Sequence, residues 1–77
     1  MEFANVVTKQ MVEDWGDNKG LDVIEKLEAI LRERFGNGDF TIETAVDHEG
    51  FLMISVSSGM WEAPREFGFD AEGRLIS

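Results

Sequence analysis

The sequence predicts an α+β domain in which two N-terminal helices pack on one face of a four-stranded antiparallel β-meander. Apolar residues recur with a helical period in the first half of the chain and with a period of two in the second half. Two short segments in the second half, "DHEG" and "DAEG", share an Asp-x-Glu-Gly pattern that is typical of tight turns. Because 77 residues have room for one core, we expect residues 1–77 to form a single domain.

The clearest element is a predicted helix from Leu21 to Phe35. Its apolar residues fall within one half of a helical wheel, and acids precede bases at a spacing of four. Asp17 or Asn18 can cap its start, and Gly36 can end it. We expect its core residues to be Leu27, Ile30 and Leu31.

A first helix is predicted upstream, ending near Gly16. Phe3, Val7, Met11 and Trp15 recur every four residues, as on one face of a helix. The stretch "FANVV" is rich in residues that also favour strands, so the alternative is that the chain begins as a strand.

The second half is predicted to hold four strands. Alternation from residue 40 places Phe40 and Ile42 on the core face and Glu43 and Asp47 on the opposite face. The remaining strands are "FLMISVSS", "REFGFD" and a short last strand, "RLIS". Their expected core residues are Met53 or Ile54, Val56, Phe67 and Phe69. Since residues 51–56 are apolar on both faces, we expect the sheet to have a second face that needs cover.

The segment "EFGFDAEGRLI" is similar to the closing hairpin of many small α+β domains, including some NTF2-like proteins. The resemblance covers about a dozen residues. It implies a hairpin at this place, and no site residue is carried over from it.

The two Asp-x-Glu-Gly segments are predicted to be type I turns in which the glycine restarts the ladder with a bulge. A calcium loop is excluded, because an EF-hand needs oxygen ligands at regular positions ending in an acid. "DHEGFLMISVSS" lacks those ligands after its first residues.

Nothing in the sequence points to catalysis or to a cofactor. His48 is the only histidine and is expected at a solvated turn, where it lacks a site that excludes water. With no cysteine, a zinc site is not expected, and the carboxylates are interpreted as solvated surface acids. Phosphate-binding glycine patterns are also missing. We therefore expect a protein that is not an enzyme.

The net charge of −9 favours a basic protein partner and disfavours nucleic acid and anionic membranes. No Lys or Arg occurs between Phe35 and Pro64, a stretch that contains five acids: Asp39, Glu43, Asp47, Glu49 and Glu62. Glu43, Asp47 and Glu49 are the candidate acidic docking residues. The alternative is a charge that only keeps the protein soluble.

The loop "SGMWEAP" supplies the other candidate contacts. Met60, Trp61 and Glu62 lie between a glycine and a proline, and Trp and Met are common at interfaces. The alternative is that Trp61 folds back over one end of the sheet.

In size and charge the chain is similar to small acidic inhibitors and immunity proteins, and we expect a non-enzymatic protein that docks on a basic partner. The competing hypothesis is a structural domain that associates as a homodimer, with its acidic face solvated. The chain lacks cysteines, a basic leader and any long apolar run, so we expect a cytoplasmic protein without a membrane span.

Overall fold

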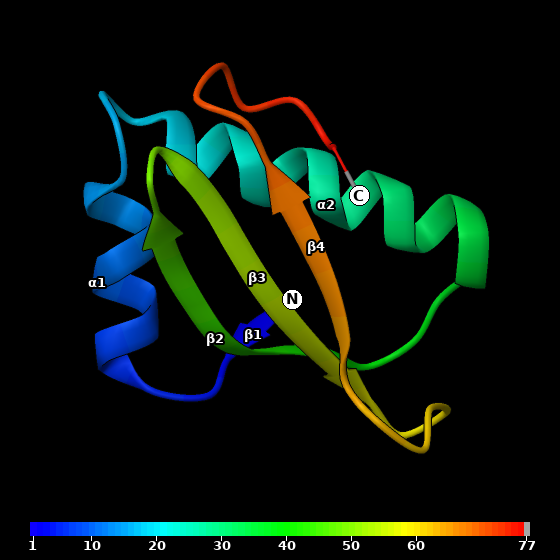
Figure 1. The fold of residues 1–77 in the computed structure, drawn as a ribbon. Coiled ribbons are helices and arrows are strands. Elements are labelled where there is room, and N and C mark those ends of the chain that lie inside the picture. The colour runs from blue at the N-terminus through cyan, green and yellow to red at the C-terminus, as the bar shows by residue number, and fades with distance from the viewer. Residues whose placement is uncertain (77) are drawn as a thin grey trace.

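A computed structural model describes residues 1–76, which form one sheet with both helices packed on the same face (Figure 1). In chain order the elements are β1 (Glu2–Phe3), α1 (Val6–Asp14), α2 (Lys19–Phe35), β2 (Phe40–His48), β3 (Phe51–Ser58) and β4 (Arg65–Phe69). The strands lie side by side in the order β1-β2-β3-β4. In Figure 1, α2 crosses behind β3 and β4. The fold is α+β with two helices and a four-stranded sheet.

The predicted four-stranded antiparallel meander is wrong in two respects. First, the sheet begins before the helices, because β1 pairs in parallel with β2 and places Phe3 opposite Ile42. Second, Ser77 of the predicted last strand, "RLIS", lies outside the described residues, and residues 74–76 form only a single bridge, with Leu75 opposite Phe69. The antiparallel meander therefore consists of β2, β3 and β4. A two-residue parallel pairing between distant segments leaves no periodicity in the sequence that would reveal it.

Helix α2 confirms the helix predicted over residues 21–35 and begins at Lys19. It ends at Phe35, where the backbone N–H of Gly36 donates to the carbonyl of Arg32 at 2.9 Å. Asn18 precedes the helix, but its side chain makes no capping hydrogen bond. The buried residues of this helix are Gly20, Val23, Ile24, Leu27 and Leu31.

Helix α1 ends at Asp14, close to the predicted end, and part of its predicted face meets the core, since Trp15 is buried and Met11 packs against the core. The Asn5 side chain caps it by accepting from the backbone N–H of Thr8 at 2.8 Å. Thr8 and Val12 are buried, whereas Val7 is 76% exposed. Phe3 lies in β1, so the four-residue spacing spans two elements instead of one helical face. The alternative that the chain begins as a strand is correct for these first residues.

A β-bulge in β2 changes which residues face the helices. The register with β3 shifts between Ile42 and Thr44, which leaves Glu43 as an extra residue. Beyond it, Ala45 is buried at 9% exposure and Val46 is 52% exposed. Strict alternation, which predicts the reverse, is wrong here because one inserted residue moves every later side chain to the other face.

The core fills the space between the helices and the inner face of the sheet. Its buried members are Val12, Trp15, Val23, Ile24, Leu27, Leu31, Ile42, Ala45, Leu52, Ile54, Val56, Phe67 and Phe69. Of the predicted core residues, Ile30 and Phe40 are only half-buried. Between the two residues left open, Ile54 is the buried one, so Met53 lies on the outer face.

Both Asp-x-Glu-Gly segments form hairpin turns, but of different kinds. Glu49 and Gly50 alone join β2 to β3, and both have positive φ, 54° and 87°. Positive φ at both positions is the mark of a type I′ turn, so the predicted type I turn is wrong at this hairpin. In the second segment the N–H of Gly73 donates to the carbonyl of Asp70 at 2.9 Å, and Gly73 has φ 79°. This turn agrees with the predicted type I turn followed by a left-handed glycine.

We expect Glu49→Asn to stabilise the fold by about 0.5–1 kcal/mol, because asparagine adopts the left-handed region more readily than glutamate. Urea denaturation of the variant and the parent protein measures the difference. The control is Glu72→Asn, which removes the same charge in the second turn at a residue without positive φ. An equal gain in the control would show that loss of charge, and not relief of backbone strain, causes the effect.

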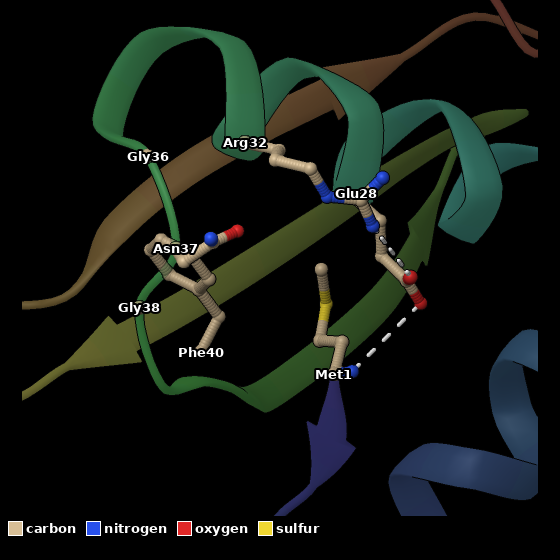
Figure 2. Close-up of a pocket in the computed structure, with 7 residues that line it drawn as sticks. All are labelled: Met1, Glu28, Arg32, Gly36, Asn37, Gly38 and Phe40. Carbon is tan, nitrogen blue, oxygen red and sulfur yellow. Dashed lines mark ion pairs between the residues drawn. The ribbon is translucent and has the colours of Figure 1, made fainter.

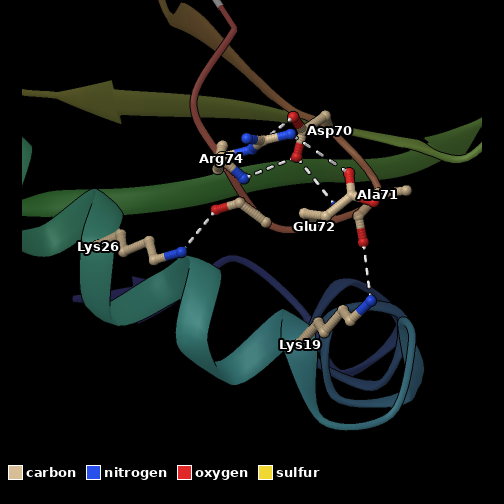
Figure 3. A network of polar contacts seen from close by, with 7 residues as sticks. Lys19, Lys26, Asp70, Ala71, Glu72 and Arg74 are labelled. Carbon is tan, nitrogen blue, oxygen red and sulfur yellow. Dashed lines mark hydrogen bonds and ion pairs between the residues drawn. The ribbon is translucent and has the colours of Figure 1, made fainter.

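Two lysines of α2 hold the second turn against the helix (Figure 3). The Nζ of Lys26 donates to the carbonyl of Gly73 at 2.9 Å, and the Nζ of Lys19 donates to the carbonyl of Ala71 at 3.1 Å. These contacts join the C-terminal hairpin to a helix far away in the sequence, and they fix the position of the residues that follow the turn.

The turn is also braced from within, by the Asp70 carboxylate. It accepts from the backbone N–H of Arg74 at 2.9 Å and of Glu72 at 3.0 Å. These hydrogen bonds, that of Arg74 first, hold the pKa of Asp70 below its usual value. After the turn, the N–H of Ile76 donates to the carbonyl of Gly68 at 2.8 Å. The last described residues thus extend the sheet beyond β4.

Candidate interaction surface

The sheet face that points away from the helices, here called the outer face, carries a row of apolar residues. Val46 on β2 pairs with Met53 on β3, and Met53 pairs with Gly68 on β4. The backbone N–H of Ile76 donates a hydrogen bond to the carbonyl of Gly68, so Ile76 extends the row. Val46 and Ile76 are each 52% exposed. These four residues, the apolar row, run across the strands, and within residues 1–76 no helix covers them.

Phe51 widens the apolar surface on the side of the β2–β3 hairpin. It pairs with His48 at the end of the two strands and is 41% exposed. Both side chains share the outer face with Val46 and Met53, because side chains two residues apart along a strand point to the same side.

The other side of the apolar row is polar and acidic. Ser55 pairs with Thr44 on one neighbouring strand and with Glu66 on the other. Glu43, the bulge residue, accepts a hydrogen bond from the Ser57 hydroxyl, with 2.6 Å between Oγ and Oε1. Glu66 is exposed and Glu43 is half-buried. We call Glu43 and Glu66 the acidic flank of the outer face.

The three acids predicted to form one docking face do not lie together. Glu43 is on the outer face, but Asp47 pairs with the fully buried Leu52 and so lies on the helix side of the sheet. Glu49 occupies the hairpin turn. The prediction that Glu43 and Asp47 share a face is wrong, and the reason is again the bulge between them.

Met60, Trp61 and Glu62 lie at the opposite end of the sheet from Glu49. They belong to the loop that joins β3 to β4, whereas Glu49 precedes β3 (Figure 1). At about 3.3 Å per residue, β3 separates the two groups by roughly 23 Å. The six candidate residues therefore do not form one continuous surface.

Trp61 folds back over the end of the sheet, as in the alternative interpretation. Its ring centroid lies 5.0 Å from that of Phe35, edge to face, and 5.5 Å from that of Phe40. The Arg65 guanidinium lies 5.0 Å from the ring centroids of both Trp61 and Phe35. Met60 beside it remains 51% exposed. The Trp61 ring therefore closes the core at this end, where cation–π contacts to Arg65 add to the packing.

Val46, Phe51, Met53 and Ile76 were not among the candidate site residues, although one feature of the sequence pointed to them. The double-sided apolar run over residues 51–56 predicted a second apolar face. Which side chains it exposes depends on the bulge and on the chain that returns to Gly68. Neither can be read from local periodicity.

A small hollow lies where the N-terminus meets the end of α2 (Figure 2). Its volume is about 170 Å³, and its lining includes Phe40 and Asn37. The Glu28 carboxylate stands 3.9 Å from the Met1 ammonium and 3.9 Å from the Arg32 guanidinium. The hollow is smaller than the roughly 300–1,000 Å³ typical of small-molecule sites, and ion pairs occupy its polar lining.

Residues 1–76 bring together no group of three or more His, Cys, Asp or Glu side chains able to hold a metal ion. His48 is exposed at the end of β2. Within the same residues, neither helix has both the length and the apolar character needed to cross a membrane.

Comparison with known proteins places the chain in no family: no family model, no curated protein and no solved structure matches it. The candidate surface is therefore defined by its geometry alone.

Proposed function

We propose that the protein is a non-enzymatic interaction domain that docks its outer face on a basic protein partner. The apolar row with its acidic flank carries this proposal. Protein interfaces combine an apolar centre with a polar rim, and Val46, Phe51 and Ile76 supply exposed apolar area beside Glu43 and Glu66. The proposed contact is therefore on the sheet rather than on the loop at Met60.

The charge of the chain determines the kind of partner. A protein of net charge −9 repels acidic proteins and is steered towards basic ones, so docking is expected to weaken as salt rises. This is the mode of action expected of a small acidic inhibitor. Because the chain has no cysteine and needs no disulfide, we place this activity in the cytoplasm.

The test is affinity capture from a lysate of the source organism at low and high salt, with the parent protein and the double variant Val46→Ser, Phe51→Ser. We expect the parent to retain one basic protein at low salt and the double variant to lose it. The matched control is Val7→Ser, which removes the same type of side chain from α1, where it is 76% exposed. Equal capture by all three proteins, or capture insensitive to salt, would contradict docking through the outer face.

Self-association is the second candidate, because two copies can bury the same apolar row against each other. Stacking two outer faces brings two acidic flanks of like charge together, which favours the basic partner instead. Sedimentation equilibrium separates the two hypotheses. A dimer that dissociates in the double variant would favour the structural domain, and a monomer at all concentrations would favour docking on another protein.

A further inference from the structure

We infer that the partner segment which covers the outer face is an amphipathic helix with basic residues along one flank. This inference rests on the proposed function and names the shape and charge of the partner. It follows from three features of the outer face: its position on the sheet, its dimensions and the one-sided placement of its acids.

The first feature is that the apolar row lies on the face of the sheet and not at an edge. At one edge β1 and α1 lie against β2, where the N–H of Ala4 donates to the carbonyl of Ile42 at 2.9 Å. At the other edge, the chain returns alongside β4. There the N–H of Asp70 donates to the carbonyl of Arg74, and the N–H of Ile76 donates to the carbonyl of Gly68. A segment laid on a face receives no backbone hydrogen bonds from the sheet, so it must satisfy its own. A helix does so, and it is the element that normally covers a sheet face.

The second feature is the length of the apolar row. From Val46 to Ile76 it crosses three strand spacings, about 14 Å in total at roughly 4.8 Å each. A helix rising 1.5 Å per residue covers that length with about 10 residues, or three turns. Its diameter of about 10 Å spans the row together with Phe51 beside it. A short helix with apolar residues at i, i+3, i+4 and i+7 therefore matches the surface.

The third feature is that the two sides of the apolar row differ. Phe51 borders the row on the hairpin side, where the Asp70 carboxylate is paired with the Arg74 guanidinium at 3.2 Å, whereas Glu43 and Glu66 border it on the other. The hydrogen bond from Ser57 holds the Glu43 carboxylate in place, so it is a fixed negative charge. A bound helix therefore places its Lys or Arg residues on the flank that faces these two acids, and an apolar residue against Phe51.

The experiment is an NMR titration of the complete protein with two synthetic peptides of identical leucine and lysine content. One peptide has the helical period and the other strictly alternates. We expect the helical peptide to shift the methyl signals of Val46, Met53 and Ile76 but not that of Val7. Its Kd should be at least about tenfold lower than that of the alternating peptide, a difference of about 1.4 kcal/mol.

Charge-reversed variants test the flank. Glu66→Lys should raise the Kd of the helical peptide by about tenfold at low salt, because it replaces an attractive charge with a repulsive one. Glu25→Lys, which changes another exposed acid, on α2, should leave the Kd within about twofold. Equal effects of the two variants would overturn the assignment of the acidic flank, since net charge alone would then govern binding.

The peptide titration also separates this inference from the proposed function. Tighter binding of the alternating peptide to the outer face would overturn the helix and leave docking through the outer face standing. If neither peptide shifts Val46, Met53 or Ile76, the helix inference is overturned. In that case, capture of a partner that depends on Val46 and Phe51 would still support the proposed function. If the capture does not depend on these two residues, both the helix inference and the proposed function are overturned.

Discussion

Gly20→Ala is expected to destabilise the protein by about 2–3 kcal/mol, although alanine is the better helix former by about 1 kcal/mol. Gly20 lies in the first turn of α2, where α2 passes α1. A Cβ at this position would collide with the carbonyl oxygen of Val12 and stand 2.8 Å from its carbonyl carbon. Because these are backbone atoms, the helices have to move apart, and the buried Val12 loses contacts.

Urea denaturation followed by circular dichroism measures this loss. The control is Gly59→Ala, since nothing lies within 4 Å of a Cβ at Gly59. We expect the control to change the stability by less than about 0.5 kcal/mol. A Gly20→Ala protein as stable as its parent would show that α1 and α2 do not approach each other closely at this point.

The parts of this fold that the sequence predicts are those specified by neighbouring residues. Helix α2 has an apolar stripe, acid–base pairs and a glycine at its end, all within the segment itself. β3 and β4 are likewise continuous apolar or alternating runs between turn residues. Such local agreement among pattern, capping and turns is what allows an element to be predicted from one sequence.

The parts that escape prediction depend on contacts between distant segments. β1 exists because two residues pair with β2 across the whole helical half of the chain. Gly20, which in the sequence belongs to a short linker, is instead needed where two helices meet. The bulge at Glu43 has no sequence mark, since any residue can be the inserted one. Each of these features depends on contacts between segments that are distant in the sequence.

The candidate surface shows the same division. A second apolar face was predictable, because residues 51–56 are apolar on both sides. Its acids were misassigned, because the bulge keeps Glu43 on the outer face and moves Asp47 to the helix side. The bulge also exposes Val46. The feature that makes the prediction from strict alternation wrong is therefore the one that completes the apolar row. An insertion that places a side chain in this way is a common use of bulges at functional surfaces.

The second large expected effect follows from the bulge, which buries Ala45 and exposes Val46. Ala45→Glu should destabilise the fold by about 3 kcal/mol or more, because it places a charged carboxylate without a partner in the core. Val46→Glu introduces the same glutamate at the neighbouring position. It should lower the free energy of unfolding by less than about 1 kcal/mol, because Val46 is 52% exposed. Thermal and urea denaturation of the two variants measures both values.

Strict alternation without a bulge predicts the opposite order, with Val46→Glu the damaging change, so the pair of variants decides between the two registers of β2. The folded Val46→Glu protein has a further use, because it adds an acid to one end of the apolar row without disturbing the core. We expect it to keep its stability and to lose the basic partner, since a carboxylate buried against apolar side chains is left unpaired. A Val46→Glu protein that is folded and still captures the partner would show that docking takes place on another surface.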